Sequence, residues 1–157
     1  MKFFVLDTNI LVGFFDPDDA CHETAYTIVD TLVTAPAELK IVIPRLVIPE
    51  LIITLKAKGM ADATIQTALG DFLSLSFVTV LDISEIQMHQ FAAQVPKRSP
   101  GMAVVRTTDY MVGVLARAID GLVLTFDKHL PKMSSFARCL LFTNGEDMAK
   151  LQREVEP

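Results

Sequence analysis

The chain has 157 residues, of which 51% are hydrophobic, and a formal net charge of −5, so it can form one domain with a sizeable buried core. No stretch is long and uncharged enough for a membrane helix, and Asp7 cuts the apolar start too short for a signal peptide. The two cysteines lie far apart without metal-binding spacing, so we expect free buried thiols and a cytoplasmic protein.

Short apolar runs alternate with helical patterns along the chain. The runs are rich in β-branched and aromatic residues and predict buried strands at 2–6, 40–44, 76–81, 121–126 and 138–142. Helical patterns occupy 18–35, 45–59, 62–75, 84–95, 107–119 and 144–155. This alternation predicts a three-layer α/β/α fold with a central parallel sheet of about five strands, formed by residues 1–157 as a single domain.

Two helices between residues 45 and 75 follow one another without an intervening strand. The first ends in Lys-Ala-Lys-Gly, which is typical of a helix C-terminus, and KGMADA supplies the turn. We therefore expect a helical hairpin at about 45–75. Because this segment is strongly apolar, we also consider it the candidate surface for a homodimer.

The first predicted strand leads directly into the polar triplet Asp7-Thr8-Asn9, inside the apolar stretch FFVLDTNILVGFF. The simplest interpretation is a helix start, because these side chains accept hydrogen bonds from the unpaired N–H groups of a first helical turn. The alternative is a functional acid, because ligands of parallel sheets bind beyond the carboxyl ends of the strands.

Three further acids fall near the same predicted edge of the sheet. Glu50 follows the second strand within the first turns of an apolar helix, Asp109 begins the helix before the fourth strand, and Asp127 ends that strand. Taken singly, each could cap a helix, complement a helix dipole or lie in solvent. Taken with Asp7, they are expected to converge on one cleft.

Converging carboxylates raise each other's pKa and destabilise the fold unless a cation lies between them. Their hard oxygen atoms favour Mg²⁺ or Mn²⁺, and such an ion suits the hydrolysis of phosphodiester bonds. Neither GxGxxG nor GxxxxGK occurs, which argues against a nucleotide cofactor.

The segments VLDTNILV, VIPELI and TTDYMVGVLARAIDGLVLTFDKHL occur in this order and together resemble the PIN-domain nucleases, most of all the VapC-type ribonuclease toxins of prokaryotic toxin–antitoxin pairs. The resemblance spans nearly the whole chain. It implies Mg²⁺- or Mn²⁺-dependent cleavage of single-stranded or structured RNA, a homodimer, and a small antitoxin protein that obstructs the site.

The resemblance also implies a catalytic quartet at Asp7, Glu50, Asp109 and Asp127. The three aspartates would ligate the metal directly or through water, and Glu50 would complete the site or position the attacking water. An RNA-processing PIN nuclease that is not a toxin, or an inactive PIN-like scaffold, are the alternatives. A phosphatase of the haloacid-dehalogenase kind is disfavoured, because Asn9 stands where its second Asp is required.

Two more residues have supporting roles by resemblance, and two depart from the family pattern. Asn9 would orient the first acid, and Thr125 would place a hydroxyl near the fourth. Many relatives carry another acid where this chain has His129, and a small residue where it has Tyr110. These departures bear on the binding of a second metal and on which substrates fit.

Positive charge is concentrated late in the chain. Residues 97–138 include seven basic and three acidic side chains, whereas the remainder is strongly acidic. The stretch QVPKRSPGMAVVR, ahead of Asp109, is a longer basic loop than the fold needs. We predict that Lys97, Arg98 and Arg106 contact the RNA backbone, with an ordinary solvated loop as the alternative.

Overall fold

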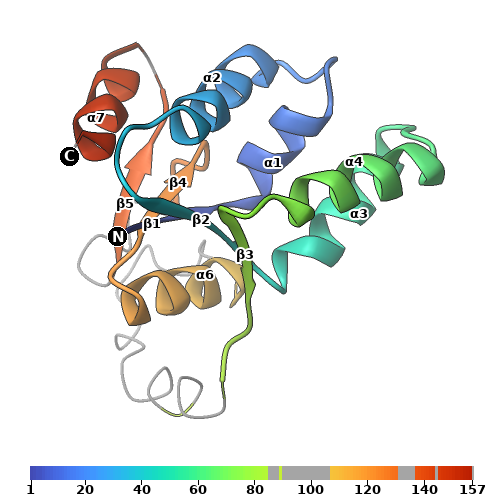
Figure 1. Cartoon of the computed structure of the whole chain (residues 1–157). Coiled ribbons are helices and arrows are strands. Elements are labelled where there is room, and N and C mark those ends of the chain that lie inside the picture. Colours follow the sequence, from blue (N-terminus) through green and yellow to red (C-terminus); the bar gives the residue numbers. More distant parts are fainter. Residues whose placement is uncertain (85–88, 90–106, 131–136, 144, 157) are drawn as a thin grey trace.

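The structure is a computed structural model, and it describes residues 1–84, 89, 107–130, 137–143 and 145–156 (Figure 1). Nearly all of the helix predicted at 84–95 lies outside the described residues. The same holds for Lys97, Arg98 and Arg106, so their predicted contact with RNA stays a prediction.

Five strands form one parallel sheet in the order β3-β2-β1-β4-β5. Their bounds are β1 (Lys2–Leu6), β2 (Leu39–Pro44), β3 (Val78–Leu81), β4 (Leu122–Thr125) and β5 (Arg138–Leu141). Each lies within two residues of its predicted range, and the predicted parallel α/β fold is confirmed. Phe4 on β1 pairs with Ile41 on one side and with Leu122 on the other. The strand order therefore reverses beside β1, where ligand sites of such sheets form.

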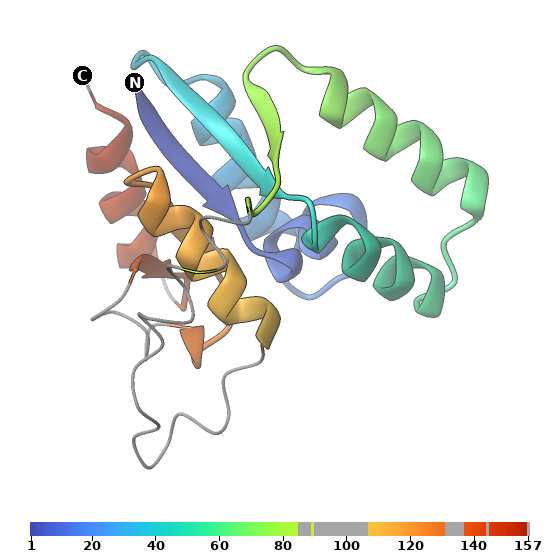
Figure 2. The same ribbon diagram turned by 90° about the horizontal axis from the view of Figure 1, so that it is seen from below.

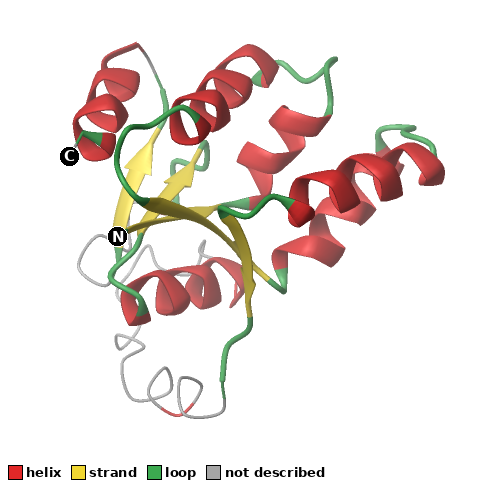
Figure 3. Cartoon of the chain, in the orientation of Figure 1, coloured by secondary structure: helices red, strands yellow, loops and turns green. Residues whose placement is uncertain are grey.

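Helices cover both faces of this sheet. The described helices are α1 (Thr8–Phe15), α2 (His22–Val33), α3 (Val47–Ala57), α4 (Asp62–Ser74), α6 (Thr107–Ala118) and α7 (Gly145–Val155). Figures 1 and 3 show α1, α2 and α7 on one face and α6 on the other. The helix predicted from residue 18 starts at His22 instead, because Asp16 and Asp19 accept hydrogen bonds from the backbone N–H groups two residues ahead and hold a turn there.

The predicted helical hairpin is present as α3 and α4, which project from the edge of the sheet in Figure 2. Gly59 begins the turn between them with φ at +93°, a backbone conformation that glycine adopts without strain. Ile53 on α3 exposes 67% of its surface and Leu75, just beyond α4, exposes 39%. The hairpin therefore presents apolar side chains to solvent.

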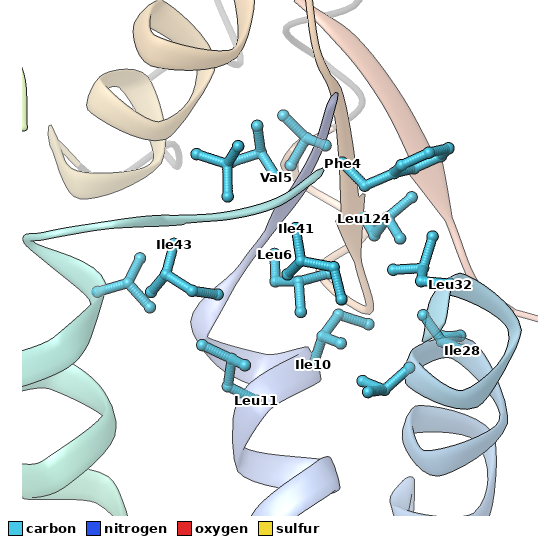
Figure 4. Close-up of a cluster of buried hydrophobic side chains, with 14 of the residues drawn as sticks. Phe4, Val5, Leu6, Ile10, Leu11, Ile28, Leu32, Ile41, Ile43 and Leu124 are labelled. Carbon is cyan, nitrogen blue, oxygen red and sulfur yellow. The ribbon is translucent and has the colours of Figure 1, made fainter. Parts of the chain in front are cut away.

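The hydrophobic core lies between the sheet and its covering helices. Figure 4 shows side chains of β1, β2 and β4 packed with those of α1 and α2, including the fully buried Leu6, Ile10 and Ile28. Both faces of the central strands are covered, which explains why their sequences are continuously apolar rather than alternating. No helix of the described residues has the length and apolar character that a membrane span requires.

Candidate functional site

A cleft of about 330 Å³ opens at the carboxyl edge of the sheet, beside the point where the strand order reverses. Its lining includes Asp7 after β1, Glu50 on α3, Asp109 on α6 and Asp127 after β4. The structure therefore brings the four predicted acids from four distant parts of the chain to one place. We call it the acidic cleft.

Asp7 is both a helix cap and a member of this cleft. It precedes α1 in an extended conformation, and its Oδ1 accepts a hydrogen bond of 2.8 Å from the backbone N–H of Thr8. Only 6% of its surface is exposed. The two interpretations of the polar triplet are thus compatible, because a buried strand end places a capping acid at the functional edge.

A hydrogen-bond network fixes the other oxygen of this carboxylate. Oδ2 of Asp7 accepts from Oγ1 of Thr125 at 2.7 Å and from Nδ2 of Asn9 at 2.8 Å. Oγ1 of Thr125 in turn accepts from the backbone N–H of Asp127 at 2.9 Å, and Oδ1 of Asn9 accepts from that of Phe126 at 3.0 Å. Asn9 and Thr125 therefore tie the end of β1 to the end of β4.

The environment of Asp7 opposes its ionisation. The pKa of this carboxyl is raised from 3.8 to about 6, with burial as the largest cause and the negative charges of Asp109 and Glu50 acting in the same direction. The hydrogen bonds from Thr125 and Thr8 act in the opposite direction, because they stabilise the carboxylate. When no cation is bound, the ionised form of Asp7 therefore destabilises the folded protein.

Thr8 is a site residue that the sequence analysis did not identify. Its hydroxyl donates a 2.8 Å hydrogen bond to Oε2 of Glu50, which joins the first turn of α1 to the first turn of α3. The only signal in the sequence was its place between Asp7 and Asn9. Nothing local indicated that its partner would be an acid 42 positions away.

The remaining two aspartates are held in different ways. Asp127 accepts a 2.8 Å hydrogen bond at Oδ1 from the backbone N–H of His129, which fixes the turn after β4. Asp109 lies in the first turn of α6 and is 8% exposed. Its charge acts on Asp7, so the α6 side of the site is electrostatically coupled to the β1 side.

An ion-pair cluster anchors the loop beside the acidic cleft. Nζ of Lys58 lies 2.7 Å from Oδ2 of Asp16 and 2.8 Å from Oδ2 of Asp19. The hydrogen bonds from Lys58 lower the pKa of both carboxyls, and these bonds raise the pKa of the lysine. The cluster holds Asp19 and Cys21 in the wall of the cleft.

Both cysteines are free, as predicted, but they are half-buried rather than fully buried. The difference arises because Cys21 lies in the cleft-lining loop, and Cys139 lies on the outermost strand β5. Burial nevertheless raises the pKa of both thiols, that of Cys139 to about 11.

The donor atoms of the cleft suit a hard divalent cation. Within the described residues, no three acidic, histidine or cysteine side chains approach closely enough to hold one ion in common. Mg²⁺ commonly binds through one or two carboxylates and retains several waters, so such a close cluster is not required. Asp7 accepts three of the roughly four hydrogen bonds its carboxylate can take, which leaves capacity toward the cleft.

The sheet order and the acidic cleft define a parallel α/β protein with four carboxyl side chains gathered near its switch point. A PIN domain model matches residues 4–135. The chain therefore belongs to the PIN-domain family. Among curated proteins, none matches the chain significantly.

The chain is similar to several solved structures of bacterial proteins. VapC20 of Mycobacterium tuberculosis, a sarcin–ricin loop cleaving toxin, has 15% identity and a TM-score of 0.64, over 85% of this chain and 96% of that one. VapBC2 from Rickettsia felis, bound to a DNA fragment from its promoter, has 17% identity and a TM-score of 0.67, over 90% and 100%. VapBC-1 from nontypeable Haemophilus influenzae has 15% identity and a TM-score of 0.66, over 91% and 100%. At such identities the similarity establishes the fold.

Proposed function

We propose that this protein is a metal-dependent endoribonuclease that hydrolyses phosphodiester bonds of RNA. The observation that carries the proposal is the gathering of Asp7, Glu50, Asp109 and Asp127 in one cleft. Membership of the PIN-domain family and similarity to a toxin that cleaves the sarcin–ricin loop support it.

The residues of the cleft would have different roles in the reaction. Asp7, Asp109 and Asp127 would hold Mg²⁺ or Mn²⁺, directly or through water, and the bound ion would polarise the phosphate and lower the pKa of a water. Asn9 and Thr125 keep the Asp7 carboxylate oriented. Glu50, itself held by the hydroxyl of Thr8, completes the site or orients the attacking water.

Cleavage of single-stranded RNA tests this function. We expect the purified protein to cut RNA when Mn²⁺ or Mg²⁺ is supplied and to lose the activity when a chelator is added. Asp109→Asn, which removes one charged ligand from the cleft, should lose it as well. Intact RNA under all metal conditions would contradict the proposal and favour a catalytically inactive scaffold.

The biological role we propose is that of a toxin paired with an antitoxin. The similar VapBC2 and VapBC-1 structures support this role. A small DNA-binding protein encoded directly upstream, binding this chain and blocking cleavage, would distinguish a toxin from an RNA-processing nuclease.

We further propose that the protein forms a homodimer through the α3–α4 hairpin, because Ile53 and Leu75 are exposed there. Ile53→Lys should convert the dimer to a monomer, because burying an unpaired charge in an interface costs several kcal/mol, on the order of 2–5. Light scattering measures the mass, and Val33→Lys at an exposed position on α2 is the matched control. A parent protein that is monomeric at micromolar concentration would contradict this interface.

A further inference from the structure

A second cavity, of about 310 Å³, adjoins the acidic cleft. It lies between the start of α2, the ends of β4 and β5, and the start of α7. Cys21 and Phe126 line both spaces, so the two lie side by side. We call it the side cavity.

The side cavity differs in chemistry from the cleft beside it. None of its lining residues in the described part of the chain is charged. Phe126 and Phe142 stand edge to face with ring centroids 6.2 Å apart, and Met148 adds a polarisable side chain. Thr24 and Thr143 add hydroxyl-bearing side chains to its lining, and the hydroxyl of Thr143 donates a 3.0 Å hydrogen bond to Asp147. Apolar and aromatic walls with a few polar atoms suit a neutral, flat ligand rather than a phosphate.

Phe126 is positioned by the same network that positions the acids. It stands between Thr125 and Asp127, and its backbone N–H donates to Oδ1 of Asn9. Asn9 therefore links the backbone of Phe126 to the carboxylate of Asp7, to which its Nδ2 donates. A strand whose phosphate lies in the acidic cleft would have its adjoining nucleotide next to this aromatic wall.

We infer that the side cavity receives a nucleobase of the RNA strand whose neighbouring phosphate occupies the acidic cleft. This inference rests on the proposed ribonuclease function and adds a substrate subsite to it. Unstacked bases of single-stranded RNA are commonly held against aromatic side chains. The uncharged cavity accepts the base, while the acidic cleft, with its cation, accepts the phosphate.

Binding of two short single strands tests the subsite in the presence of Ca²⁺, a hard divalent cation that can occupy the acidic cleft in place of Mn²⁺, with gel analysis to verify that the strands stay intact. One strand carries bases, and the other has the same sugar-phosphate backbone without bases. By fluorescence anisotropy, the parent should bind the strand with bases about tenfold more tightly, as expected for one base stacked on an aromatic ring. Phe126→Leu, which removes the ring, and Thr24→Leu, which adds bulk at the cavity from an exposed position on α2, should reduce this preference to less than about twofold.

The matched control is Thr27→Leu, the same change at an exposed position one turn further along α2 that does not line the side cavity. It should keep the parental preference, and all variants should bind the abasic strand equally. A parent without base preference, or a preference that survives both Phe126→Leu and Thr24→Leu, would overturn the subsite. The parallel cleavage assay with Mn²⁺ separates the two proposals, because a parent that cuts RNA while failing the base test retains the nuclease function alone.

Discussion

Replacing Asp7 with Asn should abolish RNA cleavage and at the same time stabilise the folded protein at neutral pH. The activity should fall by more than about a hundredfold, because a charged oxygen ligand of the metal is lost. The stability should rise because the parent carries an ionised carboxylate that is 6% exposed and lies near Asp109 and Glu50. Loss of function with a gain of stability is the signature of a site residue rather than of a structural one.

The magnitude follows from the pKa of the Asp7 carboxyl, which the fold raises from 3.8 to about 6. Since the folded state holds this proton more tightly, the carboxyl favours folding below its unfolded pKa, and that advantage is lost as the pH rises through about 6. At neutral pH the cost of the ionised group is up to about 3 kcal/mol. Asn has one oxygen where Asp7 has two, so one hydrogen-bond donor loses its acceptor, which costs about 1–2 kcal/mol. The unfolding free energy of the variant should therefore exceed that of the parent by about 1–2 kcal/mol.

Thermal or denaturant unfolding in the presence of a chelator measures this effect. The variant should exceed the parent near pH 7, and the difference should vanish or reverse near about pH 4, where Asp7 of the folded parent is protonated. Asp30→Asn makes the same chemical change on the exposed side of α2 and should show neither effect. A variant that is less stable than the parent at neutral pH would show that the carboxylate contributes to the fold as a cap only.

The sequence predicted the fold well because the strands are buried on both faces. Such strands appear as short continuous apolar runs, and β1 was predicted to the residue at 2–6. Helix starts were less well predicted. The start of α2 at His22 depends on hydrogen bonds that the side chains of Asp16 and Asp19 accept from backbone N–H groups, and a periodic apolar pattern does not reveal them.

The positions of two of the four acids could be predicted for a topological reason. A residue that follows a parallel strand lies at a known edge of the sheet, which places Asp7 and Asp127 before any coordinates are available. The hydrogen bond from Thr8 to Glu50 could not be predicted, because it depends on the packing of α1 against α3. The side cavity could not be predicted either, since α2, α7 and the ends of two strands together form its walls.

Thr125 should prove more important to the site than its single hydroxyl suggests. It is fully buried, it donates to Asp7, and it accepts from the backbone N–H of Asp127. Thr125→Val keeps the shape and the β-branching but leaves that N–H without its acceptor. We expect a loss of about 2–3 kcal/mol of unfolding free energy, as for a buried donor left unpaired beside a carboxylate that also loses a bond.

The Mn²⁺ concentration that cleavage requires distinguishes a role of Thr125 in the site from a role in stability alone. A purely structural effect would not change this concentration. The Thr125 hydrogen bond lowers the pKa of the Asp7 carboxyl, so its removal should raise that pKa further above its present value of about 6. Because a metal ligand must be deprotonated, the Mn²⁺ concentration for half-maximal cleavage should increase in Thr125→Val, and more so near about pH 6 than near about pH 8. Thr125→Ser retains the hydroxyl and loses only a methyl group, so its Mn²⁺ requirement should follow the parent at both pH values. If Val and Ser variants needed the same Mn²⁺ concentration near pH 6, Thr125 would act on stability alone and not on the acid that we propose binds the metal.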